Sequence, residues 1–160
     1  MYKKTNTMKL LSTTTLLLFV SMAYSQMGLQ TLPSVDLKTT DGKTVNSSSF
    51  GNDGKPMVIN FWATWCKPCV AQIPDIKKLQ NKYNDQLIII GISSNDELSK
   101  LRDYTQRATM EWPQIQMDEE ISKSFGGVFA FPLGVLFDDG GKLIKYDITP
   151  KEILRVLDKK

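Results

Sequence analysis

The chain contains two cysteines, three positions apart, in the segment Trp65-Cys66-Lys67-Pro68-Cys69. A disulfide between Cys66 and Cys69 would close a very short loop, so by the chain-entropy argument it would add little to the stability of the fold. Two thiols at this spacing are better suited to exchanging disulfides with other molecules. The pair therefore predicts redox chemistry rather than a structural cross-link.

The segments on either side of the pair predict a strand and a helix. Met57–Trp62 is apolar with a β-branched and aromatic bias, which is typical of a buried strand. Apolar residues then recur at helical spacing behind the pair, at Val70, Ile73, Ile76, Leu79 and Tyr83. Cys66 therefore lies at or near a helix N-terminus, where unpaired backbone N–H groups should stabilise its thiolate and lower its pKa. Cys69, one turn further in, should be more buried and ready to attack a mixed disulfide.

At these residues the chain resembles the thioredoxin superfamily, and within it the TlpA/ResA-type thiol-disulfide oxidoreductases that bacteria export. The resemblance rests on the Trp-Cys-x-Pro-Cys motif that follows an Asn-Phe-Trp strand. It implies an α/β, thioredoxin-like fold with a central mixed sheet flanked by helices. It also implies an enzyme whose catalytic residues are Cys66 and Cys69 and which needs no cofactor beyond their redox-active disulfide.

A second segment, Phe129-Ala130-Phe131-Pro132-Leu133, precedes another predicted strand. In the superfamily a proline here follows a cis peptide bond and faces the two cysteines. The resemblance implies that Phe131–Pro132 is cis and that the Phe131 backbone pairs with a substrate segment. Because proline has no N–H and cannot ligate a metal, it would keep the approach to Cys66 open. The alternative is an ordinary trans proline, and Phe131 is larger than the residue common at this position.

Three residues beside the cysteines are candidates for supporting roles. Trp65 either shields the Cys66 sulfur and packs on partners or is a half-buried core aromatic. The charge of Lys67 either favours the Cys66 thiolate or is simply solvated. Pro68 restricts the turn and removes one N–H from the motif.

Two amides stand where related proteins carry acids. Asn60 occupies the position of the buried acid on the central strand of cytoplasmic thioredoxins, and Gln72 that of a glutamate in ResA-like proteins. Neither amide can titrate. Proton transfer from Cys69 would have to use water, Lys67 or an acid that the sequence pattern does not identify.

Metal binding is the first alternative function. A zinc site needs about four ligands, and the chain has two thiols and no histidine, so we expect no metal site. Haem attachment at Cys-x-x-Cys-His is excluded because Val70 follows Cys69. A Cu(I)-binding module stays open, since two thiolates bind Cu(I), with Met57 and Met117 as possible thioether ligands.

A peroxiredoxin-like peroxidase is the second alternative. Its Pro-x-x-x-Thr/Ser-x-x-Cys motif would require Pro at position 59 and Thr or Ser at position 63. The chain has Ile59 and Ala63 instead. The motif also does not match when Cys69 is taken as the peroxidatic cysteine.

Residues 1–25 are typical of an export signal. Lys3, Lys4 and Lys9 precede an apolar run over 10–23 that is interrupted at 12–15, and Ala23-Tyr24-Ser25 predicts cleavage before Gln26. An uncleaved membrane anchor is the alternative reading. The three lysines account for the formal net charge of +3, so residues 26–160 are balanced and indicate no nucleic-acid partner.

Residues 26–160 predict one thioredoxin-like domain. An N-terminal β-hairpin extension is indicated by Val35 and Leu37, the turn Asp41-Gly42 and the return strand Thr44-Val45. The elements after the first helix are a parallel strand at 87–92, a helix capped by 94–97, a strand at 114–117, a helix at 119–125, a hairpin of 133–137 with 143–146, and a helix capped by 149–152.

These patterns together predict an exported, periplasmic or otherwise extracytoplasmic protein disulfide reductase. The Lys-Pro between the cysteines lacks the histidine of strongly oxidising motifs, which favours reduction. The resemblance suggests protein thiol and disulfide substrates, such as apocytochrome c or misoxidised proteins, and a membrane electron donor that re-reduces the enzyme. We expect a monomer.

Overall fold

The computed structural model describes residues 28–50, 53–94 and 96–159, and Thr31–Lys160 form one compact unit. The predicted signal peptide or anchor over residues 1–25, and the cleavage position before Gln26, lie outside the described residues. Within the described part of the chain, no helix is long and apolar enough to cross a membrane.

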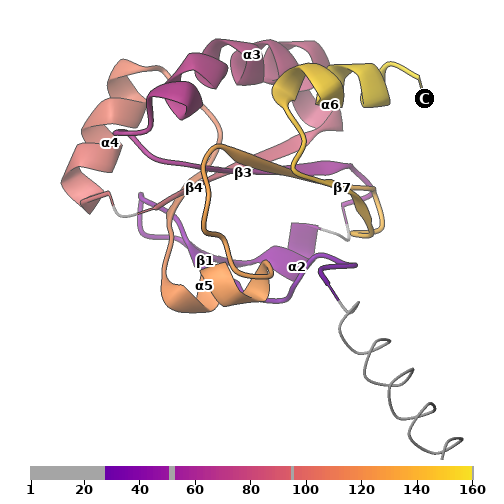
Figure 1. The fold of residues 1–160 in the computed structure, drawn as a ribbon, viewed down its shortest axis with the longest axis horizontal. Helices are drawn as coiled ribbons and strands as arrows, with labels where there is room; N and C mark the ends of the chain where they lie inside the picture. Colours follow the sequence, from indigo (N-terminus) through magenta and orange to yellow (C-terminus); the bar gives the residue numbers. More distant parts are fainter. Residues whose placement is uncertain (1–27, 51–52, 95, 160) are drawn as a thin grey trace, which may run out of the picture. The chain divides into compact units, whose positions relative to one another are not determined.

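A five-stranded mixed sheet forms the centre of the unit (Figure 1). Its order is β5 (Gln114–Gln116), β4 (Ile88–Ser93), β3 (Met57–Trp62), β6 (Leu133–Phe137) and β7 (Leu143–Tyr146). Strand β3 pairs in parallel with β4 and antiparallel with β6. All six β3 residues are buried, as expected of a central strand that is covered on both faces.

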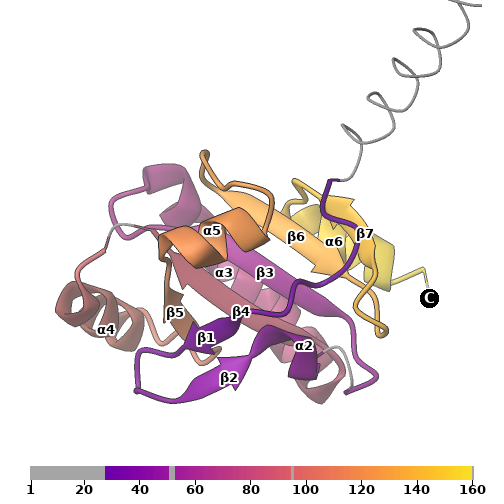
Figure 2. The ribbon, with the colours of Figure 1, turned by 90° about the horizontal axis from the view of Figure 1, so that it is seen from below.

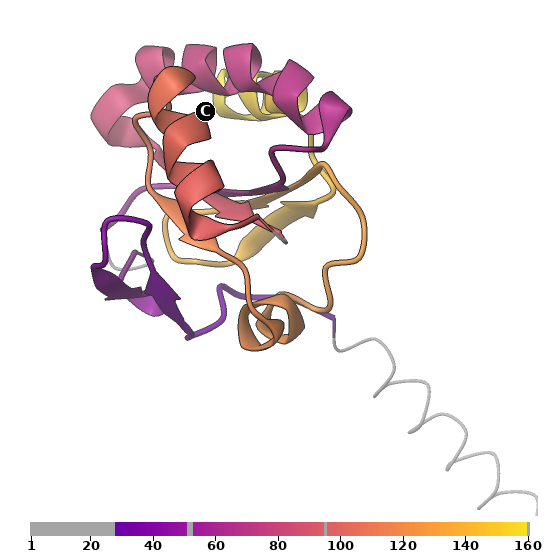
Figure 3. The same ribbon diagram turned by 90° about the vertical axis from the view of Figure 1, so that its left-hand side faces the viewer.

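Helices cover both faces of this sheet. One face carries α3 (Lys67–Tyr83), α4 (Leu98–Arg107) and α6 (Pro150–Leu157), and the other carries α5 (Glu119–Ser124) and the hairpin of β1 (Asp36–Lys38) with β2 (Thr44–Asn46) (Figures 2 and 3). The predicted fold class, element order and N-terminal hairpin are therefore confirmed. The patterns missed two short elements, α2 (Ser47–Phe50) and the 3₁₀ turn η1 (Asn84–Gln86).

The alternation of β3 builds a core on each face. Val58 and Trp62 belong to a buried cluster with apolar residues of α3, α4 and α6. Phe61 points to the opposite face, where its ring meets Phe125 edge to face with centroids 5.3 Å apart. Full burial of such side chains stabilises the fold by roughly 1.5–3 kcal/mol each. This packing fixes β3 and α3, and thereby both sides of the cysteine motif.

The predicted capping box at the start of α6 is confirmed. The Thr149 side chain accepts a hydrogen bond from the Glu152 N–H at 3.3 Å, and the Thr149 N–H donates to the Glu152 carboxylate at 2.9 Å. Pro150 occupies the first turn, where its missing N–H costs nothing. The carboxylate of Glu152 also pairs with Lys145 of β7 at 2.8 Å, which ties the helix to the sheet.

The predicted capping box of Ser94 to Glu97 is wrong. Helix α4 begins at Leu98 with Glu97 at the N-cap, and no side chain caps it. Glu97 instead pairs with Lys100 at 2.9 Å. The Asp96 carboxylate turns away from the helix to the buried donors of Thr64 and Ser93. Ser94, the capping residue of the predicted box, is held at the end of β4 because its N–H donates to the Trp62 carbonyl at 2.9 Å, and the helix begins three residues later than predicted.

Candidate active site

Cys66 and Cys69 are joined by a disulfide where β3 gives way to α3, with Cα atoms 5.2 Å apart. Both residues are buried, Cys66 at 6% and Cys69 at 2% exposure. The two cysteines are therefore in the expected order, with Cys69 the more deeply buried residue. In the described residues there is no further cysteine that could form a competing bridge.

Cys66 occupies the N-cap of α3, as the spacing predicted. Its sulfur accepts a hydrogen bond from the backbone N–H of Cys69 at 3.3 Å, and its carbonyl accepts one from Val70 at 3.0 Å. Lys67 and Pro68 are exposed residues of the first helical turn. An N–H aimed at the sulfur and the positive end of a helix are the two features that stabilise a thiolate here.

The Phe131–Pro132 peptide bond is cis, as the resemblance implied. The rings of Trp65 and Phe131 meet edge to face, with centroids 6.3 Å apart. This contact joins the segment that carries the cysteines to the segment that carries Pro132. Trp65 is 59% exposed, so the alternative of a core aromatic is wrong.

Phe129 is an exposed aromatic residue near Phe131 in the chain that the sequence patterns did not single out. Its side chain is 91% exposed, two residues before the half-buried Phe131. Among the described residues, the backbone of 129–132 makes no hydrogen bond with other backbone groups. An aromatic surface beside unpaired backbone groups is suited to binding an extended peptide.

The two amides lie at the predicted places. Asn60 is buried in the middle of β3, where its neighbours in the sheet are Gly91 of β4 and Gly134 of β6. Gln72 is half-buried in α3, one turn after Cys69. Neither position offers a group that titrates.

One buried acid beside the motif was missed by the sequence patterns. Asp96 is 5% exposed and accepts hydrogen bonds from the backbone N–H of Thr64 at 2.9 Å, from the Thr64 hydroxyl and from the Ser93 hydroxyl. Thr64 stands two residues before Cys66. The available signal was position, because Asp96 follows β4 at the same sheet edge at which Cys66 follows the parallel strand β3.

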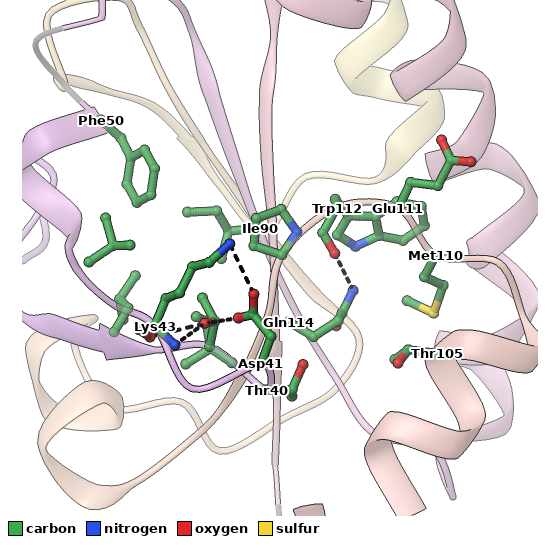
Figure 4. Close-up of a pocket in the computed structure, with 15 residues that line it drawn as sticks. Thr40, Asp41, Lys43, Phe50, Ile90, Thr105, Met110, Glu111, Trp112 and Gln114 are labelled. Carbon is green, nitrogen blue, oxygen red and sulfur yellow. Dashed lines mark hydrogen bonds and ion pairs between the residues drawn. The ribbon is translucent and has the colours of Figure 1, made fainter.

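A pocket of about 360 Å³ lies between the N-terminal hairpin and the β5 edge (Figure 4). Asp41 and Lys43 form an ion pair at 3.2 Å on one side, and the Gln114 amide donates to the Trp112 carbonyl at 3.3 Å on the other. None of the residues that line it belongs to 65–69 or 129–132. The redox pair therefore lies outside this pocket.

Metal-ligand groups do not gather in the described part of the chain. There, no cluster of three or more His, Cys, Asp or Glu side chains is placed to hold a metal ion. Met57, one of the two possible copper thioethers, begins β3, five residues before the strand end that leads to Cys66. A strand rises about 3.3 Å per residue, so Met57 lies about 16 Å along β3 from the end that leads to the cysteines.

Comparison with known proteins decides the family. The Redoxin family model matches residues 29–158. The chain belongs to the Redoxin family. The thioredoxin-like protein YneN of Bacillus subtilis is 29% identical over 150 residues, which cover 88% of this chain and 86% of YneN. The thiol-disulfide oxidoreductase ResA of Bacillus thuringiensis is 30% identical over 115 residues, which cover 71% of this chain and 65% of ResA.

Solved structures agree with the Redoxin assignment. A thiol:disulfide interchange protein of Chlorobium tepidum matches with a TM-score of 0.71 and 26% identity, over 81% of this chain and 94% of that one. A thiol-disulfide oxidoreductase of Bacteroides fragilis has the same fold, with a TM-score of 0.71 at 22% identity over 81% and 98% of the two chains. The predicted membership of the thioredoxin superfamily, in its TlpA/ResA-type group, is confirmed.

Proposed function

We propose that this chain is an exported protein disulfide reductase that works through the Cys66–Cys69 dithiol. The observation that carries the proposal is the position of Cys66, at the N-cap of a long helix and with the Cys69 N–H directed at its sulfur. Thiol-disulfide exchange is also the activity named for ResA and for the Chlorobium tepidum protein. Function here therefore rests on both the site and the family.

The reaction is a transfer of two electrons in two exchange steps. The Cys66 thiolate attacks one sulfur of a substrate disulfide, the substrate S–S bond breaks, and the released substrate thiolate takes up a proton. Cys69 then loses its proton and attacks the Cys66 sulfur of the mixed disulfide. The second substrate thiol leaves, and the enzyme is left with the Cys66–Cys69 disulfide.

The aromatic surface beside Cys66 supports a polypeptide substrate. Trp65, Phe129 and Phe131 provide apolar contact area, and the unpaired backbone around Phe131 provides hydrogen-bonding groups for an added strand. Because Pro132 has no N–H, it leaves the approach of a substrate to Cys66 open. Exposed apolar side chains that form a contiguous patch mark binding surfaces.

The direction of electron flow and the cellular setting belong to the same proposal. The Lys67-Pro68 dipeptide without histidine favours a reductant, which a membrane electron donor must regenerate. Residues 1–25 support export to the periplasm or another extracytoplasmic compartment, with residues 26–160 as the thioredoxin-like domain. Apocytochrome c cysteines and misoxidised proteins fit as substrates, and a monomer suffices because both cysteines lie on one chain.

Two serine variants test the mechanism. Cys66→Ser should abolish insulin disulfide reduction with dithiothreitol as electron source, since it removes the nucleophile. Cys69→Ser should accumulate mixed disulfides with insulin, visible by mass spectrometry, because nothing resolves them. Lys142→Ala, which changes an exposed lysine just before β7 and outside the cysteine motif, is the control and should keep the exchange and the resolution. Equal reduction rates for wild type and both serine variants would refute the proposal.

A further inference from the structure

The buried carboxylate of Asp96 has no part in the exchange steps described above, yet it is tied to the segment that carries Cys66. Its partners are the Thr64 N–H at 2.9 Å, the Thr64 hydroxyl and the Ser93 hydroxyl. The carbonyl of Asp96 in turn accepts a hydrogen bond from the Gln116 side chain at 2.7 Å. Asp96 is therefore held from β5 while it holds Thr64.

Thr64 lies in the turn that leads from β3 to Cys66. The backbone N–H of Cys66 donates to the Ala63 carbonyl at 3.1 Å and closes this turn, with Thr64 as its second residue. Two hydrogen bonds from Thr64 to one carboxylate fix both its backbone and its side chain. A shift of Thr64 would move Cys66, because only Trp65 separates them.

The β4–α4 loop that supplies Asp96 is itself bound to the sheet. The Ser94 N–H donates to the Trp62 carbonyl at 2.9 Å, and the Ser93 carbonyl accepts from Met117 at 2.8 Å. Ser93 and Asp96 are both buried. A buried carboxylate that lost its donors would be costly, so the loop and the Cys66 turn keep one relative position.

We propose that Asp96 is a positioning residue that holds the Thr64–Cys66 turn so that the Cys66 sulfur stays within bonding reach of Cys69. This inference rests on the proposed function and adds a determinant of its redox equilibrium. The three donors to the carboxylate come from Thr64 and Ser93 and none comes from a cysteine, so the carboxylate acts on Cys66 through Thr64. A firmly held turn raises the effective concentration of one thiol at the other and favours the intramolecular disulfide.

Loss of Asp96 should therefore make the disulfide easier to reduce. A looser turn lowers the effective concentration of the two sulfurs. Removal of a negative charge near the turn also favours the Cys66 thiolate, and so the reduced form. Both effects have the same sign.

The test equilibrates the full-length chain with glutathione. The equilibrium constant is defined for the reaction in which the protein dithiol and oxidised glutathione give the protein disulfide and two molecules of reduced glutathione. Asp96→Asn should lower the equilibrium constant about tenfold, which is a potential about 30 mV less negative. Thr64→Val, which removes the hydroxyl donor and keeps the charge, should lower it about threefold. Thr64→Ser, which restores the hydroxyl, should stay close to wild type.

Asp118→Asn is the matched control for loss of a carboxylate. Asp118 is the N-cap of α5, and its carboxylate accepts a hydrogen bond from the Ile121 N–H at 2.8 Å. Asp118→Asn therefore removes a carboxylate that also accepts a backbone hydrogen bond, but outside the cysteine motif. Its equilibrium constant should equal that of wild type. If Asp96→Asn does not fold, the Thr64→Val and Thr64→Ser pair decides the question.

Two results separate failure of the inference from failure of the proposed function. A wild-type chain that does not exchange with glutathione would remove the proposed function itself. If the wild-type chain does exchange, but Asp96→Asn or both Thr64 variants have the wild-type equilibrium constant, only the positioning role of Asp96 is overturned.

Discussion

The rings of Trp65 and Phe131 stand at 89° to each other, and their centroids are 6.3 Å apart. The contact joins the two loops that make the site, one leading into α3 and the other into β6. Aromatic pairs in this geometry contribute about 0.5–1.5 kcal/mol beyond their burial. Trp65 therefore joins the two loops while more than half of its own surface stays exposed.

The substitution Trp65→Ala should weaken the binding of protein substrates and have little effect on small disulfide substrates. We expect KM for insulin to rise about tenfold, because an apolar contact area and the support for Phe131 are lost together. The rate with a small disulfide such as oxidised glutathione should change less than threefold. Steady-state kinetics with both substrates measure the difference.

Tyr146→Ala is the control for loss of an exposed aromatic. Tyr146 lies on the edge strand β7, with an exposure of 38%. Its variant should show wild-type KM for both substrates. If the Trp65 and Tyr146 variants behave alike with insulin, the aromatic surface beside Cys66 is not a docking surface.

Gly134 is required by close packing beside the central strand. A Cβ at this position would stand 2.1 Å from the backbone oxygen of Ile148, whose N–H donates to the Gly134 carbonyl at 3.0 Å. Gly134→Ala should therefore lower the free energy of unfolding by about 3 kcal/mol, the upper end of the cost of overpacking. Urea denaturation measures this change.

Gly140→Ala provides the comparison for Gly134. Its nearest neighbour would be the Asp138 side chain at 3.6 Å, an ordinary contact. The variant should lose less than about 1 kcal/mol. Equal losses at the two positions would mean that the approach of Ile148 does not limit residue 134.

Glu152 should make stability depend on pH in the acid range. The hydrogen bond from Lys145, followed by those from Thr149, lowers the pKa of this carboxyl from 4.5 to about 2. A lowered pKa in the folded chain stabilises it above pH 4.5, and this stabilisation is lost as the pH falls towards 2. Glu152→Gln should flatten the curve of unfolding free energy against pH between 2 and 4.5. An unchanged slope would show that other carboxyls dominate acid unfolding.

Asn60→Asp should give the opposite dependence on pH. Residue 60 is buried between Gly91 and Gly134, so desolvation would disfavour a charged carboxylate there. The introduced carboxyl binds its proton more tightly in the folded chain than in the unfolded chain. The variant should match wild type near pH 4 and lose stability as the pH rises to 8. Parallel curves for the two proteins would contradict this burial.

The sequence predicted the framework of the site because that framework follows from local patterns. The apolar run before Cys66 and the helical spacing after Cys69 require a strand and a helix that meet at the motif, and the structure has Cys66 at the N-cap. The cis bond before Pro132 followed from the family resemblance and not from local physics, since most X-Pro bonds are trans.

What the sequence could not predict depends on contacts between distant segments. Asp96 reads as part of a capping box, and only the fold shows that Thr64 competes for its carboxylate across 32 positions. The exposure of Phe129 likewise depends on how the segment between α5 and β6 lies against the rest of the fold. Patterns within one segment do not report which neighbour a polar side chain finds.

The reduction potential of the Cys66–Cys69 pair tests the central claim most directly. The purified chain is equilibrated with dithiothreitol or glutathione buffers, and the fraction of disulfide is measured by thiol alkylation. A protein disulfide reductase should give a value near that of thioredoxin, about −270 mV. A value near that of a strong periplasmic oxidant, about −120 mV, would mean that the chain introduces disulfides and that electrons flow in the opposite direction.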